Sequence, residues 1–256
     1  MTQTTSEIYK KVFPSLILYL VLIAGFNLLM NAMGLGSDAF MDPIQPGQVK
    51  PEFHITGLSY LSIALQIVYF IVVGLMGFGI TLSIYRVARY GADIGVVDMF
   101  YFFNHYAGKT ILTVILQSVL TAIGFIVLIV PGIIFSLAMT PLGAVVGLEQ
   151  LQGRSEAFEP IKKSWRATKG HKGMIFGRLV VAGIIIVVLA VIASFASLSI
   201  GASGGAFSNV IQAVLTIVSG LVTYFALVDV LRELVERGAF SEWEDDRDEV
   251  MDEGEL

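Results

Sequence analysis

The side chains that most often carry chemistry are few and scattered in this chain. Its three histidines, His54, His105 and His171, have no neighbours at a metal-ligand spacing such as H-E-x-x-H. There is no cysteine, which excludes a disulfide scaffold. No acid, base and nucleophile recur in a pattern typical of catalysis. The sequence therefore predicts a protein that is not an enzyme and that uses no cofactor or metal.

One cluster of charges is a candidate binding surface. It consists of six basic residues between two apolar stretches: Arg154, Lys162, Lys163, Arg166, Lys169 and Lys172. Either these residues follow the rule that cytoplasmic segments are rich in lysine and arginine, or they bind anionic lipid headgroups or an acidic protein surface. Membrane lipids are thus the expected partners, with a protein partner or a second copy of the chain as alternatives. Nothing in the sequence points to nucleic acid.

The composition is that of a membrane protein. Of 256 residues 55% are hydrophobic and 14% charged, compared with about 45–50% and 25% in an average soluble domain. Most of the stretches without Asp, Glu, Lys or Arg are long enough to cross a bilayer as a helix; they are residues 13–33, 58–84, 111–130, 133–148, 179–200 and 206–228. The predicted fold is an all-α polytopic integral membrane protein, with six transmembrane helices as three hairpins in a domain of residues 1–240.

The basic residues also predict the orientation. If the N-terminus is inside, only Lys50 among the 16 lysines and arginines falls on an outer segment. Both termini are therefore expected in the cytoplasm, with the chain in the inner, or cytoplasmic, membrane. Residues 241–256 are strongly acidic, and Arg247 is their only basic residue. They are expected to form a disordered cytoplasmic tail.

A partial repeat predicts helices that lie in the membrane interface. Segments 91–108 and 153–170 each begin with glycine, and Asp93 and Ser155 follow that glycine at positions suited to helix caps. Residues 6–11 resemble a rudimentary third copy. Each hairpin is therefore expected to be introduced by an interfacial amphipathic helix.

The second segment has the clearest helical pattern. Phe158, Ile161 and Trp165 recur at a spacing that places them on one face of a helix. We expect this face to enter the membrane interface, with Trp165 as its anchor.

Three residues predict the shape of the third and fourth spans. Pro131 and Gly132 mark the turn between them, and Pro141 removes a backbone donor that would otherwise support the fourth span. We therefore expect a kink at Pro141. A full crossing and a re-entrant hairpin both return the chain to the cytoplasm, and full crossing is expected because residues 111–130 are long enough.

Two pairs of glycines predict close helix contacts. Gly143 with Gly147 and Gly173 with Gly177 have the spacing that lets two membrane helices approach each other. Close packing is expected at both pairs.

One pair of charges predicts a contact between the last two spans. Arg178 and Asp229 are the charges nearest the apolar parts of the fifth and sixth spans, at similar depth. A salt bridge between them would clamp the third hairpin. The alternatives are separate solvation and pairing of Asp229 with Arg232.

Two sequence runs resemble a known family. They are residues 128–134, Leu-Ile-Val-Pro-Gly-Ile-Ile, and residues 161–170, Ile-Lys-Lys-Ser-Trp-Arg-Ala-Thr-Lys-Gly. Together they resemble a broad group of six-span bacterial and archaeal membrane proteins, which includes the YciC-like inner-membrane proteins and the membrane domain of some glycerophosphodiester phosphodiesterases. The resemblance covers residues 80–200. It implies the six-span fold and no reaction, because the phosphodiesterase chemistry belongs to a separate soluble domain.

Two functions are compatible with these features. The first is a non-enzymatic scaffold or accessory subunit of the cell envelope. The second is a carrier or lipid-handling protein with a site between the hairpins near Pro141. The polar residues within the spans, Asn27, Gln66, Gln117 and Gln212, either bond helices together or line such a site.

Overall fold

Long apolar helices account for most of the computed structural model, which describes residues 4–33, 35, 57–153, 157–199 and 205–241. Within these residues every regular element is a helix: α1 (Thr5–Ala32), α2 (Gly57–Tyr90), the short 3-10 helix η2 (Val96–Phe100), α3 (Tyr101–Asn104), α4 (Ala107–Val127), α5 (Ile129–Ala138), α6 (Leu142–Leu151), α7 (Glu159–Ala167), α8 (Lys172–Ser199) and α9 (Gly205–Glu236). Five helices are long and apolar enough to cross a membrane, or six if α5 and α6 form one bent span. This is the architecture of a multi-pass membrane protein, as the composition predicts.

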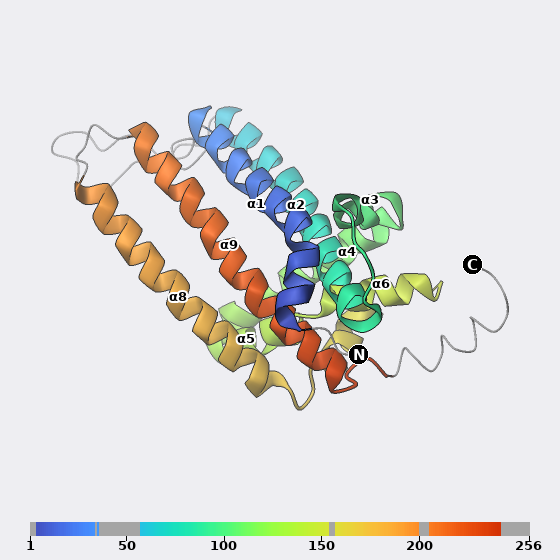
Figure 1. Cartoon of the computed structure of the whole chain (residues 1–256). Coiled ribbons are helices and arrows are strands. Elements are labelled where there is room, and N and C mark those ends of the chain that lie inside the picture. Colours follow the sequence, from blue (N-terminus) through green and yellow to red (C-terminus); the bar gives the residue numbers. More distant parts are fainter. Residues whose placement is uncertain (1–3, 34, 36–56, 154–156, 200–204, 242–256) are drawn as a thin grey trace.

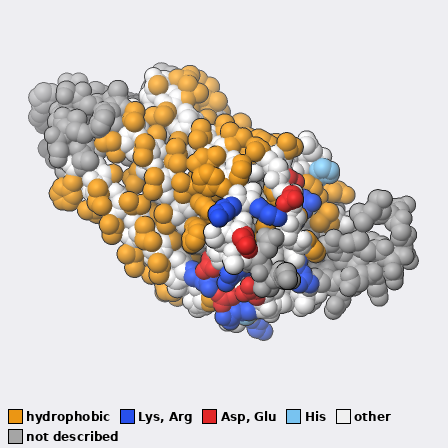
Figure 2. Space-filling view, viewed as in Figure 1, with side chains coloured by type: hydrophobic (Ala, Val, Ile, Leu, Met, Phe, Trp, Pro, Cys, Tyr) orange, Lys and Arg blue, Asp and Glu red, His pale blue; other side chains and the backbone are white. Residues whose placement is uncertain are grey.

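Four long helices form the body of the molecule. In Figure 1 α1, α2, α8 and α9 run side by side, and α9 lies between α1 and α8. Charged side chains gather at the end of the bundle where α1 and α8 begin and where α2 and α9 end, whereas apolar side chains cover the rest of the visible face (Figure 2). We call this end the charged end.

The first helix starts earlier than the apolar stretch within it. The Thr4 hydroxyl accepts a hydrogen bond from the Glu7 amide at 3.3 Å, and the Glu7 carboxylate accepts one from the Thr4 amide at 2.9 Å. This reciprocal cap satisfies amides that an α-helix leaves unpaired at its start. Residues 6–11 are therefore the first turns of α1, and the prediction that they form a separate interfacial helix is wrong.

Tightly packed side chains hold the bundle together. One core joins α1, α2 and α9 and includes Leu16, Ile80 and Leu231. A second core lies between α2, α4 and α6, and there α6 is buried from Leu142 through Gln150. These two cores thus join the long helices to the shorter ones that follow α2.

The first glycine of each predicted repeat ends a helix. Gly91 follows α2 with φ 66°, and Gly153 follows α6 with φ 69°, a left-handed conformation that glycine adopts without strain. The predicted cap Asp93 does not cap a helix, because the next helix, η2, begins only at Val96; the Asp93 carboxylate pairs with Lys11 at 2.8 Å instead. This ion pair and hydrogen bond lower the pKa of Asp93. The other predicted cap, Ser155, lies outside the described residues.

The kink predicted at Pro141 is present. Helices α5 and α6 are bent by 42° at a break that Pro141 closes as the residue before α6. Pro131 and Gly132 lie in the first turn of α5, just after the turn at Leu128. A Cβ on Gly132 would lie 2.8 Å from the Phe125 amide nitrogen, so glycine allows α4 and α5 to approach closely.

A substitution at Gly143, in the pair formed with Gly147, tests the packing of α6. A Cβ added to Gly143 would lie 2.8 Å from the Phe78 Cα, and backbone cannot move aside as a side chain can. We expect Gly143→Ala to destabilise the protein by about 1–3 kcal/mol through overpacking. Thermal unfolding in detergent measures this. The matched control is Gly183→Ala in α8, where nothing lies within 4 Å of the added Cβ; that variant should be at least as stable as the parent, and equal losses in both would contradict the packing argument.

Candidate functional site

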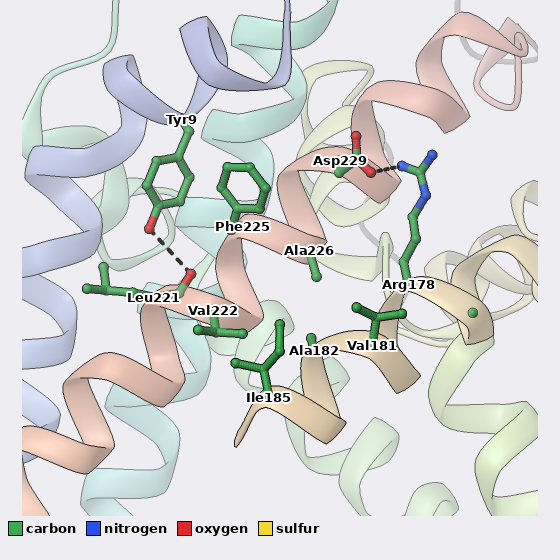
Figure 3. Close-up of a pocket in the computed structure, with 11 residues that line it drawn as sticks. Tyr9, Arg178, Val181, Ala182, Ile185, Leu221, Val222, Phe225, Ala226 and Asp229 are labelled. Carbon is green, nitrogen blue, oxygen red and sulfur yellow. Dashed lines mark hydrogen bonds and ion pairs between the residues drawn. The ribbon is translucent and has the colours of Figure 1, made fainter. Parts of the chain in front are cut away.

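A cleft opens between α1, α8 and α9 near the charged end (Figure 3). Its volume is about 640 Å³, within the range of about 300–1,000 Å³ typical of ligand pockets. Its walls are mostly aliphatic and aromatic, and two charged side chains close one end. The lining residues are Tyr9 from α1, then Gly177, Arg178, Val181, Ala182 and Ile185 from α8, and Leu221, Val222, Phe225, Ala226 and Asp229 from α9.

Small residues and the helix arrangement create this cleft. Helix α9 contacts both α1 and α8 and forms the floor between them. Gly177, Ala182 and Ala226 leave room that larger side chains would fill. The close packing expected at Gly173 and Gly177 is wrong, because nothing lies within 4 Å of a Cβ at either position. Gly177 lines an open space instead of a helix contact.

An aromatic pair from two helices forms another wall. The Tyr9 hydroxyl donates to the Leu221 carbonyl at 3.3 Å, and the Tyr9 ring meets Phe225 edge to face with centroids 5.3 Å apart. Both rings are drawn beside the cleft in Figure 3. They hold α1 against α9 along one side of the cleft.

The charged end of the cleft is a network across α8 and α9. Arg178 forms ion pairs with Asp229 and with Glu233, which in turn pairs with Arg237. The Thr5 hydroxyl donates to Asp229 at 2.9 Å, so α1 also joins the network. The structure therefore brings together the predicted pair of Arg178 and Asp229, and Arg232 pairs with Glu236 instead.

Thr5, Arg237 and Glu233 are the members of this network that sequence reasoning missed, and Glu233 is the one that pairs directly with Arg178. It lies one turn after Asp229 on α9, and this spacing places both carboxylates on one helix face. Its side chain is only 14% exposed, compared with 27% for Arg178 and 29% for Asp229. The two carboxylates beside the half-buried Arg178 guanidinium offset the cost of withdrawing its charge from water.

Part of the predicted basic cluster makes contacts within the protein. Lys163 pairs with the buried Glu149 of α6, and Lys162 pairs with Glu159 at 3.2 Å. The Lys172 ammonium lies 3.3 Å from the Trp165 ring centroid. Lys162, Arg166 and Lys169 are exposed, and Arg154 lies outside the described residues. Binding of anionic headgroups stays a prediction, and it now concerns mainly the three exposed residues.

The apolar face predicted for α7 is divided. Ile161 is buried together with Ser164 and Ala167, and the Ser164 hydroxyl donates to the Ala138 carbonyl at 2.7 Å. Trp165 is 40% exposed and Phe158 47%. The helix thus packs on α5 and α6 through one face, while both aromatic rings are exposed, and the anchor role of Trp165 stays a prediction.

The polar residues within the spans lie in different places. Gln212 lines a second cavity of about 270 Å³ between α1 and α9, together with Asn27, Asn31, Asn209 and Thr216. Gln66 donates to Ser62 of its own helix at 3.1 Å. Neither Gln66 nor Gln117 lines the cleft or this second cavity. The amide cavity is distinct from the apolar cleft.

The described residues contain no group of three or more His, Cys, Asp or Glu that could hold a metal ion. His105 stacks on Tyr101 with ring centroids 4.7 Å apart, and His54 lies outside the described residues. Comparison with protein-family models, with curated proteins and with solved structures finds no match to this chain. The resemblance to the six-span group therefore rests on its two sequence runs alone.

A double-mutant cycle tests the charge network. Arg178→Gln removes the cation that lies between Asp229 and Glu233 and leaves Glu233 paired only with Arg237, and Asp229→Asn removes one of the two carboxylates. We expect each change to lower the thermal stability in detergent, and the double variant to lose less than the sum, with a coupling of about 0.5–3 kcal/mol. Additive losses would show that the pair does not contribute to stability.

Proposed function

We propose that this protein binds a membrane lipid in the cleft between α1, α8 and α9, as a lipid-handling protein or carrier. The observation that carries the proposal is an apolar cleft, open at one side, with two charged side chains at one end only. A phospholipid has the same polarity, because its acyl chains are apolar and its headgroup is charged. The acyl chains thus match the apolar part of the cleft, and the headgroup matches its charged end.

The dimensions of the cleft support an acyl chain as its occupant. On α9 the lining runs from Asp229 back to Leu221, and on α8 from Gly177 to Ile185. At about 1.5 Å per residue each wall is about 12 Å long, close to the roughly 15 Å of one leaflet of the hydrocarbon core. One acyl chain can therefore follow the cleft while its headgroup stays at the charged end.

We also propose an orientation for the molecule, which rests on its basic residues. We place the charged end in the cytoplasm and the chain in the cytoplasmic membrane, because cytoplasmic segments are enriched in lysine and arginine. The bound headgroup then lies in the cytoplasmic leaflet. The other function suggested by the sequence is a scaffold role. Among the described residues, the cleft supports lipid binding more directly than any surface supports that role.

Native mass spectrometry of the detergent-released protein tests lipid binding. We expect one phospholipid adduct per chain. Ala226→Phe places a large ring in the cleft and should remove the adduct, whereas Val187→Phe, on the exposed face of α8, should keep it. Equal adducts in both variants, or none in the parent protein, would contradict the proposal, and a stoichiometric protein partner in place of lipid would favour the scaffold role.

A separate question is whether the α4–α5 hairpin crosses the membrane completely. We propose that it is re-entrant in place of the complete crossing expected from sequence. Helix α5 has only 10 residues, about 15 Å, and it contacts α8, whose first turns share a core with Ile133 and Leu137. Figure 1 draws α5 near the beginning of α8, at the charged end.

Cysteine labelling distinguishes the two topologies. Ile129, which is 69% exposed at the turn, is a suitable site because a side chain fits there. In intact cells an impermeant thiol reagent should not label Ile129→Cys. The control is Lys50→Cys, which is expected outside and should be labelled. Labelling of Ile129→Cys at the rate of the control would contradict the re-entrant hairpin and support six complete spans.

A further inference from the structure

We propose that the cleft selects a zwitterionic headgroup that carries both a phosphate and an ammonium group, such as that of phosphatidylethanolamine, over an anionic headgroup. This inference rests on the proposed lipid binding and adds the class of lipid. It is carried by the charges at the end of the cleft.

Both signs of charge line the cleft. Arg178 and Asp229 are lining residues, and their side chains are 27% and 29% exposed. Figure 3 shows them side by side at the same end of the cleft. A headgroup at this end therefore meets a guanidinium and a carboxylate together.

The network has no net positive charge to offer an anion. Arg178 pairs with Asp229 and Glu233, and Glu233 pairs with Arg237, so two cations face two carboxylates. An anionic headgroup would gain the attraction of Arg178 and at the same time meet the repulsion of both carboxylates. Its affinity for this end is accordingly low.

A zwitterion fits the same arrangement with both of its charges. Its phosphate can lie against Arg178, and its ammonium group against Asp229, so that charges of opposite sign alternate. Asp229 accepts one hydrogen bond from Thr5 through one oxygen and pairs with Arg178 through the other, and a carboxylate has about four acceptor sites. It therefore retains capacity for an ammonium donor.

The experiment is a competition between two lipids of equal acyl chains. The purified protein is equilibrated with micelles that contain equal amounts of phosphatidylethanolamine and phosphatidylglycerol, and native mass spectrometry gives the ratio of bound lipids. We expect phosphatidylethanolamine to be preferred by about fivefold, the ratio for about 1 kcal/mol per interfacial charge. Ala226→Phe identifies adducts that do not occupy the cleft, such as lipid on Arg166 and Lys169.

Charge variants test the cause of the preference. Asp229→Asn gives the network a net positive charge and should shift the ratio toward phosphatidylglycerol. Asp93→Asn is the matched control, because it removes a carboxylate that is 96% exposed, pairs with Lys11 and does not line the cleft; its ratio should not change. If Asp229→Asn fails to fold, Glu233→Gln removes a negative charge from the same network and should shift the ratio in the same direction.

The outcomes separate this inference from the function on which it rests. A preference for phosphatidylethanolamine that shifts in Asp229→Asn supports it. Bound lipid without a preference, a preference for phosphatidylglycerol in the parent protein, or an equal shift in Asp93→Asn would overturn the headgroup selection and leave lipid binding intact. Absence of any lipid from the cleft would overturn both.

Discussion

The bilayer interior offers no hydrogen bonds to a polypeptide backbone, and this constraint shapes every part of the structure. Each apolar stretch must satisfy its amides internally and therefore becomes a helix. Among the described residues, the helices α4, α5 and α6 are separated only by short breaks, at Leu128 and at residues 139–141. Most charged groups are left at one end, where the charged residues of α1, α2, α8 and α9 gather.

Specific contacts must hold these helices together, because lipid tails are as apolar as the helices themselves. On one side of α2 the contact is steric, since Gly143 lies against the backbone at Phe78. Between α8 and α9 it is ionic, through Arg178, Asp229 and Glu233. Where neither contact reaches, beside Gly177 and Ala226, the helices separate and the cleft results. The cleft thus lies beside the ionic contact that joins α8 to α9.

Particular residues show how far sequence reasoning reached. The helical class, the approximate positions of the long helices, the kink at Pro141 and the pair Arg178 and Asp229 follow from local patterns and from depth along a span. Glu233 was missed because it lies one turn farther from the apolar stretch than Asp229, although this spacing places both carboxylates on one helix face. The buried pair of Glu149 and Lys163 was missed because it depends on how α7 folds back on α6.

By itself the sequence determined that this is an all-helical, multi-pass membrane protein, because long uncharged stretches have no other stable form in a bilayer. Tertiary structure decided which faces of those helices meet. It buried Ile161 but left Trp165 exposed, closed the helix contact at Gly143 and left the one at Gly177 open. Apolar residues that contact lipid and apolar residues that contact protein have the same composition, so only the packing of distant segments distinguishes a wall of the cleft from the surface of the bundle.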